Sequence, residues 1–555
     1  MKNSQNKLWL FLAIFSIVFI YIWFSYRLNL SLIFDEAYTI YFSQSYKTIA
    51  DDTWPPLYYA IVYTSRLLGA YSEWSIRLLS VFATIALGTI IFLYGRFLFG
   101  NKVTLFALLG VVLSPVVIRY AFWARGYSLL IVFSALVSLT TTSLALRGPT
   151  KYRMFSWATA CWLLAATHHF GTILAISSYL ILRFAYFRDD AAKKLQDTAF
   201  ILLCSLSPLF ITNVRQLLLG VRAITAIHYI QLEQVIKLFA PSSAIPVTAT
   251  QMIVGLLLLI LVIYGSKQNT PKNKVSFNTS DNLDSSSKQS LIAEHLNKNK
   301  VFSHKWILPF LGMMILYVAV FVFCNDLWPK ASSWAAILTT VALLGLKLFD
   351  LVSVRSSKLK CWSYLRTIHP LALLLAITLI IASLISIIIP IANPRNLLIL
   401  LPGYWLLAAY GFFRLSKNKR LVVAAILTLS LIASLITFEQ RFGRHENWRE
   451  AIAIAKNLLK PMDDVSIRPF WGSPILTYYG INNKPLMLNR GNEICKLPAS
   501  VNHVVILSSQ WHHVYGSKKW QRRFEQEINN CAEIISTVEL DGVKVQRVKI
   551  KSKLP

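Results

Sequence analysis

Long apolar runs separated by short polar stretches fill most of the chain and stop near residue 440. Each run is about as long as the roughly 20 residues that a helix needs to cross a bilayer, and about thirteen such runs occur. The expected spans are 8–26, 74–99, 102–121, 126–146, 154–168, 171–187, 198–220, 247–265, 306–325, 331–350, 369–390, 396–414 and 421–438. The pattern therefore predicts an all-α, polytopic membrane core over residues 1–439.

The apolar stretch 154–187 is too long for one ordinary span, and it carries THHFG at its middle. We expect two short helices there, with a turn at His168, His169 and Gly171. Two adjacent histidines point in different directions on a helix, and no carboxylate follows at a matching spacing, so a polar turn that lines a cavity is favoured over a metal site.

The chain is strongly basic, with 56 Lys and Arg against 25 Asp and Glu and a formal net charge of +31. The first apolar run follows Lys2 and Lys7 and lacks a small-residue cleavage site, so we interpret it as an uncleaved anchor with a cytoplasmic N-terminus. Counting spans from there places each Lys- and Arg-rich loop inside, including the polar segment 266–304, which we expect to be a flexible loop. Topology in a cell (inner or plasma) membrane thus explains the charge, and no nucleic acid partner is needed.

The remaining residues, 440–555, predict a small extracytoplasmic α/β domain. Helical spacing occurs in NWREAIAIAKNLLK and in KKWQRRFEQEINN, HVVILSS has the character of a buried strand, and EIISTVELDGVKVQRVKI predicts a hairpin that turns at Asp541 and Gly542. Cys495 and Cys531 share this region, and on an oxidising side of the membrane they could pair or stay free.

Five short motifs occur in a fixed order along the membrane part. They are FDEAYT after the first span, PPLYYAIVY with SIRLLS about twenty residues later, ARGYSLLI opening the fourth span, THHFG at an outer turn, and PRNLLILLPG near the end. This order resembles the GT-C glycosyltransferases, in particular the protein O-mannosyltransferase and aminoarabinose-transferase superfamily and its bacterial members. NWREAIA after the last span is also typical of those bacterial members.

The resemblance implies a GT-C fold and the transfer of one sugar from a polyprenyl-phosphate donor. The acceptor would be a lipid, a glycan or a protein on the extracytoplasmic face. The sequence agrees in one respect, because it has no G-x-x-x-x-G-K-[ST], G-x-G-x-x-G or D-x-D motif that would hold a nucleotide or a nucleotide sugar. No cofactor is indicated, and a divalent metal is possible but not supported.

Such a transfer needs a carboxylate that takes the proton of an acceptor hydroxyl as it attacks the anomeric carbon with inversion. We expect Asp35 to be this base, with Glu36 beside it. The neighbouring carboxylate and partial desolvation should raise the proton affinity of the pair. The alternative is that these carboxylates cap or ion-pair the next interfacial helix.

Cations are needed for the departing lipid phosphate. We expect them to be Arg125 in WARGY and Arg395 in NPRN, with Arg119 and Lys330 as weaker candidates. Each of these side chains could instead extend to lipid headgroups.

Further substrate contacts are expected from the residues around these motifs, namely Trp54, Tyr58, Tyr127, His168 and His169. Trp54 stands where many relatives have a basic residue before Pro-Pro, so a phosphate contact from that position is absent. The start of the fourth span also lacks the carboxylate that other relatives have, which makes a metal-dependent mechanism less secure.

Two other function classes fit a polytopic chain. A secondary transporter or lipid flippase would also place charges within its spans, but no internal repeat is evident and the acidic residues gather at one face. A scaffold that displays the tail domain is the third possibility. Replacing Asp35 separates them, since only the enzyme needs this carboxylate.

Overall fold

The computed structural model describes a chain that is mostly helical and ends in a small sheet. The described residues are 14–51, 54–187, 190–205, 257, 260–266, 368–388, 395–442, 446–468, 472–482, 485, 486, 488, 491–498, 500–509 and 518–551. The expected spans 306–325 and 331–350 lie outside them, as do most of 198–220 and 247–265, nearly all of the loop 266–304, and Lys330.

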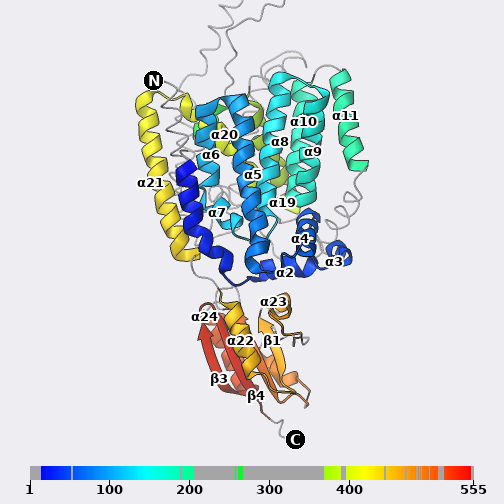
Figure 1. Ribbon diagram of the computed structural model, residues 1–555, viewed down its shortest axis with the longest axis vertical. Helices are drawn as coiled ribbons and strands as arrows, with labels where there is room; N and C mark the ends of the chain where they lie inside the picture. The colour runs from blue at the N-terminus through cyan, green and yellow to red at the C-terminus, as the bar shows by residue number, and fades with distance from the viewer. Residues whose placement is uncertain are drawn as a thin grey trace, which may run out of the picture.

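The helical part packs as a bundle above the sheet (Figure 1). Its described elements are η1 (Ser25–Asn29), α2 (Phe34–Phe42), α3 (Tyr46–Asp51), α4 (Leu57–Leu67), α5 (Glu73–Phe99), α6 (Asn101–Val112), α7 (Pro115–Ala121), α8 (Tyr127–Arg147), α9 (Lys151–Thr167), α10 (His169–Ile181), η2 (Leu182–Tyr186), α11 (Asp190–Ser205), α19 (Pro370–Ile388), η5 (Asn396–Leu400), α20 (Leu401–Phe413) and α21 (Lys417–Phe442).

Within the described residues, four helices are long and apolar enough to cross a membrane, or up to six if each of two bent pairs is one span. The expected spans 74–99, 126–146, 396–414 and 421–438 coincide with these four helices to within a few residues. The total of about thirteen spans stays a prediction.

Two expected spans bend. The first continues to Asn29 and then turns by 73° into α2, and the expected span 102–121 is broken into α6 and α7, which meet at 63°. Proline explains the second break, because Pro115 has no N–H to donate into a continuing helix and is favoured in the first turn of a new one.

The expected split of 154–187 is confirmed. His168 is extended, with φ −160° and ψ 140°, and it both ends α9 and begins α10. Gly171 permits the tight approach of the two helices, because a Cβ there would overlap the backbone of Leu164.

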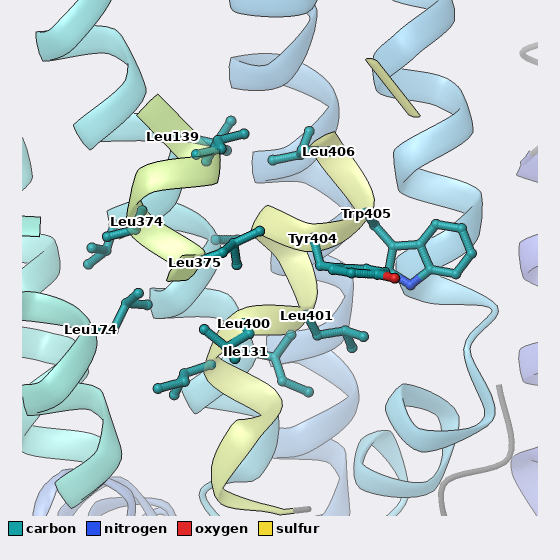
Figure 2. Packing of buried hydrophobic residues seen from close by; sticks show 14 of the residues in the cluster. Ile131, Leu139, Leu174, Leu374, Leu375, Leu400, Leu401, Tyr404, Trp405 and Leu406 are labelled. Carbon is teal, nitrogen blue, oxygen red and sulfur yellow. The ribbon is translucent and has the colours of Figure 1, made fainter. Parts of the chain in front are cut away.

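The core of the helical part lies where α8, α10, α19, η5 and α20 meet (Figure 2). Its labelled members are fully or nearly fully buried: Ile131, Leu139, Leu174, Leu374, Leu375, Leu400, Leu401, Tyr404, Trp405 and Leu406. Lipid is as apolar as leucine, so close packing has to hold such helices together. Gly110 illustrates this, since a Cβ there would overlap the Trp405 ring and separate α6 from α20.

The outer faces of the bundle are apolar. Leu421 and Leu429 on α21 are 74% and 68% exposed, and Phe82 on α5 is 61% exposed. Side chains of this kind on long apolar helices face hydrocarbon in a membrane and would be unfavourable in water. The chain is therefore a multi-pass membrane protein.

The tail has a four-stranded sheet of order β1-β2-β4-β3. β1 (Asp464–Arg468) pairs parallel with β2 (His503–Ser509), whereas β3 (Ala532–Leu540) and β4 (Val543–Ile550) form the expected antiparallel hairpin. α22 (Trp448–Leu458) and α24 (Lys518–Cys531) are the two expected helices. β1, α23 (Ser473–Tyr478) and η7 (Gly491–Lys496) were not expected.

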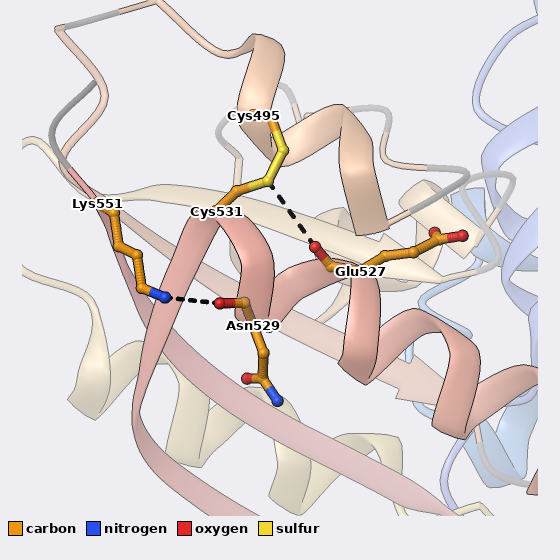
Figure 3. The surroundings of a disulfide bond; sticks show 5 residues. All are labelled: Cys495, Glu527, Asn529, Cys531 and Lys551. Atoms are coloured by element: carbon orange, nitrogen blue, oxygen red, sulfur yellow. Dashed lines mark hydrogen bonds between the residues drawn. A yellow bond between two sulfur atoms is a disulfide. The ribbon is translucent and has the colours of Figure 1, made fainter. Parts of the chain in front are cut away.

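Cys495 and Cys531 form a disulfide that joins η7 to the end of α24 (Figure 3). Their Cα atoms are 5.1 Å apart. Near this bond, Lys551 Nζ donates to the Asn529 carbonyl at 2.6 Å and ties the end of β4 to α24. Of the two pairing states that the sequence allowed, the structure has the bonded one.

Candidate active site

Helix α2 lies across the end of the bundle that faces the tail, after the expected span 8–26 and at 73° to the helix before it (Figure 1). Asp35 is the second residue of α2, so its carboxylate lies at the helix N-terminus. One carboxylate oxygen accepts from Arg395 at 3.2 Å and the other is 3.9 Å from Arg125. With 36% of its side chain exposed, Asp35 stays accessible.

Arg125 lies in the short loop between α7 and α8 and is held by two hydroxyl groups. Its guanidinium donates to the Tyr59 hydroxyl at 3.2 Å and to Thr39 Oγ1 at 3.4 Å. The same group lies 5.7 Å from the ring centroid of Trp54. These contacts place Arg125 between the carboxylate and the aromatic side chains of the site.

Aromatic rings continue from Trp54 to the turn between α9 and α10. The Trp54 and His168 rings are 4.9 Å apart, and His169 stacks on Trp54 at 6.3 Å. Tyr127, at the start of α8, has its ring 5.9 Å from that of His168. Four of the expected contact residues therefore share one cluster.

Trp123 closes the cluster on its other side. Its ring lies 6.3 Å from that of Tyr127 and 5.4 Å from the Arg395 guanidinium. The contacts thus form a closed circle of seven side chains, which we call the acid-arginine-aromatic ring. In order, its members are Asp35, Arg125, Trp54, His168, Tyr127, Trp123 and Arg395.

Arginines gather around Asp35. Arg125, Arg395 and Arg119 all act on its carboxylate, and Arg119 also lies 4.6 Å from the Trp123 ring. Clusters of guanidinium groups of this kind suit a bound phosphate.

These arginines reverse one expectation about Asp35. Burial raises the pKa of its carboxyl, but Arg125, Arg395 and Arg119 lower it by more, so the pKa lies below the ordinary value. The expected rise in proton affinity of the Asp35 and Glu36 pair is therefore wrong for Asp35, because the nearby charges are cations.

Glu36 points away from this ring and is 1% exposed. It forms a bidentate ion pair with Arg77 of α5, with distances of 2.8 Å and 2.6 Å. It also accepts from the backbone N–H of Ile33 at 3.2 Å and of Ala124 at 2.9 Å. The capping and ion-pairing alternative raised for these carboxylates thus describes Glu36 well.

Arg77 in turn fixes the elbow before α2. It donates to the carbonyl oxygens of Arg27 at 3.1 Å, Leu28 at 3.0 Å and Ser31 at 3.0 Å. We did not single out Arg77 from the sequence. Its place inside SIRLLS could have identified it, because a charge within the first turns of a long apolar helix needs a partner.

His168 is buried and offers one nitrogen. Its Nδ1 accepts from the Phe170 N–H at 3.1 Å, so the proton is assigned to Nε2. Within the described residues Nε2 has no hydrogen-bond partner, so a neutral donor is available beside Trp54.

Tyr58 is a buried neighbour of the site and is not a member of the acid-arginine-aromatic ring. It is 3% exposed, its hydroxyl is 3.2 Å from Ser80 Oγ, and Ser80 donates to the Trp123 carbonyl at 2.7 Å. These bonds support the loop that carries Trp123 and Arg125. Among the described residues, no three His, Cys, Asp or Glu side chains come close enough to hold a metal ion.

No family model and no curated protein matches the chain. Among solved structures, ArnT from Cupriavidus metallidurans bound to undecaprenyl phosphate is similar at 12% identity and a TM-score of 0.49, over 98% of each chain. The Archaeoglobus fulgidus oligosaccharyltransferase AglB, in complex with an inhibitory peptide and a dolichol-phosphate, is similar at 11% identity and a TM-score of 0.40, over 98% of this chain and 74% of that one.

Proposed function

We propose that the protein is an inverting membrane glycosyltransferase of the GT-C type that moves one sugar from a polyprenyl-phosphate donor to an acceptor hydroxyl. The observation that carries the proposal is Asp35, a solvent-accessible carboxylate set among three arginines at one edge of a ring of aromatic side chains.

The arginines around Asp35 suit the leaving group of this reaction. A polyprenyl-phosphate sugar is a phosphodiester with one negative charge, and the polyprenyl phosphate that departs approaches two. Arg125 and Arg395 would therefore bind the developing dianion more tightly than the intact donor, and such differential binding lowers the barrier.

Asp35 would act as the base. The acceptor oxygen attacks the anomeric carbon, its proton passes to the Asp35 carboxylate, and the bond from that carbon to the phosphate oxygen breaks with its electron pair leaving on the phosphate. Once the phosphate has bound, Arg125 and Arg395 share their charge with it, so the pKa of Asp35 rises toward a value better suited to a base.

The aromatic part of the ring would hold the transferred sugar. Trp54 and Tyr127 offer flat apolar faces, which suit the C–H faces of a pyranose or furanose, and the His168 Nε2–H can donate to a sugar hydroxyl. No group on these residues supplies redox or nucleotide chemistry. Their part is to position the sugar.

The reaction face would be extracytoplasmic. The Asp35 end of the bundle carries the tail with its disulfide, and such bonds persist in oxidising compartments. The opposite end carries basic loops such as RGPTKYR at 147–153, in keeping with the positive-inside rule.

The test is sugar transfer by the purified protein from a panel of radiolabelled polyprenyl-phosphate monosaccharides, with an envelope extract as the source of acceptor. We expect one donor to be consumed, and Asp35→Asn to lower kcat by about 10²- to 10⁴-fold, the usual contribution of a general base. Glu539→Gln, at an exposed carboxylate of the tail hairpin, is the matched control and should behave as wild type.

Equal turnover by wild type and Asp35→Asn would remove Asp35 as the base. Movement of the labelled lipid across vesicle bilayers without covalent transfer, unaffected by the substitution, would instead favour the flippase alternative.

A further inference from the structure

The segment at the start of α2, Ser31 to Phe34, is held by the tail domain as well as by the bundle. Ser31 Oγ donates to the Glu446 carbonyl at 2.6 Å and accepts from the Trp448 N–H at 3.1 Å. The Leu32 N–H donates to the Tyr479 hydroxyl at 2.8 Å. Residues more than 400 positions away thus fix the backbone just before Asp35.

Side-chain packing continues this contact up to the base itself. Phe34, the neighbour of Asp35, packs on Trp448 with ring centroids 4.8 Å apart, and Trp448 is fully buried. Gly472 also lies against the Phe34 ring, so closely that a Cβ on Gly472 would overlap it. Phe34 is therefore enclosed by two segments of the tail.

Polar contacts anchor the same surface to α5. Arg449 forms an ion pair with Glu73 and donates to the Asn29 carbonyl at 2.9 Å. The Tyr479 hydroxyl also bonds Glu73. The NWRE segment has no part in the proposed mechanism. Its Trp448 contacts α2, and its Arg449 contacts the start of α5.

We propose that this surface is a positioning device for the base, with Trp448 and Gly472 as positioning residues that act through Phe34. This inference rests on the proposed function. Catalytic groups have to stay within fractions of an ångström of their working geometry. The Glu36 and Arg77 ion pair supports α2 from the bundle, and the tail supplies a second support through Phe34.

The sharpest test adds one methyl group. Gly472 has φ −75°, which alanine adopts without strain, so Gly472→Ala changes only the space that the Phe34 ring occupies. We expect kcat for sugar transfer to fall by about 10- to 100-fold, because the displaced ring shifts Asp35 relative to Arg395. KM for the donor should change little, since both arginines stay in place.

Rescue distinguishes displacement from general damage. Phe34→Leu removes most of the ring, so the double variant Gly472→Ala/Phe34→Leu should recover at least the activity of Phe34→Leu alone. The matched control is Gly88→Ala in α5, where the added methyl meets only ordinary contacts at 3.5 Å and 3.8 Å and should change nothing. Hydrogen exchange of residues 31–42 should rise in Gly472→Ala and not in the control.

Two results would overturn the proposal while wild type still transfers sugar and Asp35→Asn does not. One is a Gly472→Ala protein with wild-type kcat. The other is a Gly472→Ala protein that loses activity, does not regain it in the double variant with Phe34→Leu, and shows no change in hydrogen exchange at residues 31–42. Failure of the proposed function itself is recognised separately, by equal turnover of wild type and Asp35→Asn.

Discussion

Adjacent residues in α2 have opposite surroundings. Asp35 is 36% exposed and faces arginines, whereas Glu36 is 1% exposed and is bound by Arg77 and two backbone N–H groups. Consecutive residues on a helix point about 100° apart, so one side chain can enter a site while the next enters the core. The sequence analysis chose Asp35 as the base, but it did not predict that Glu36 would be buried in an ion pair with Arg77.

The pH dependence of transfer should reflect this cation-rich site. A base works when deprotonated, and the lowered pKa of Asp35 keeps its carboxyl deprotonated as the pH falls. We therefore expect kcat/KM to hold steady from about pH 8 down to about pH 5. The fall in kcat/KM should begin only as the pH approaches the lowered pKa of the Asp35 carboxyl.

Initial rates over this pH range provide the measurement. The acid limb of kcat should lie at higher pH than that of kcat/KM, because kcat reports the donor complex, in which phosphate offsets the arginines. A midpoint near 6.5 in kcat/KM would contradict the assignment and indicate an ionising histidine. His169→Gln is the companion variant that would identify it.

At the scale of elements, Glu36 holds three segments of the site in fixed positions relative to one another. Through Arg77 it connects the elbow before α2 with α5, and through the Ala124 N–H it holds the loop that carries Arg125. A buried ion pair of this kind is weak as a source of net stability, but the removal of one partner leaves a buried charge without compensation.

Glu36→Gln should therefore differ from Asp35→Asn in kind. We expect Glu36→Gln to destabilise the folded protein by about 3–5 kcal/mol and to lose transfer activity with it, since Arg77 stays buried and unpaired. Asp35→Asn should lose activity with little change in stability. Thermal unfolding in detergent, followed alongside transfer rates, makes the comparison. A Glu36→Gln protein that is as stable as wild type would refute this role.

Sequence patterns predicted the elements that obey local rules. α5 and α8 are continuous apolar helices, and the turn at His168 follows from a stretch too long for one span. The bend before α2, the strand β1 and the Arg77 ion pair depend on contacts with distant parts of the chain, such as the pairing of β1 with β2, and periodicity does not encode these. Arg125 and Arg395 were expected at the phosphate, but they lie 90 and 360 positions from Asp35, and their convergence on it depends on the tertiary fold.

At the scale of the whole molecule, the two ends of the bundle differ in chemistry. One end carries α2, the acid-arginine-aromatic ring and the tail (Figure 1). The other carries the basic connection between α8 and α9 and the first turn of α9, in which Tyr152 is 89% exposed. If the bundle spans a membrane, the tail and Tyr152 lie in different compartments.

This arrangement predicts opposite reactivity for two engineered thiols. Met462, 87% exposed in the tail, and Tyr152 are equally open to solvent, so each can be replaced by cysteine with little effect on packing. A membrane-impermeant maleimide applied to intact cells should label Met462→Cys at once and Tyr152→Cys only after permeabilisation, with the unaltered chain giving the background. The reverse pattern would place the ring and its arginines in the cytoplasm, where a disulfide in the tail would not persist and the positive-inside rule would be broken. Equal labelling of both thiols in intact cells would mean that the bundle does not separate two compartments, and the proposed lipid-facing reaction would lose its basis.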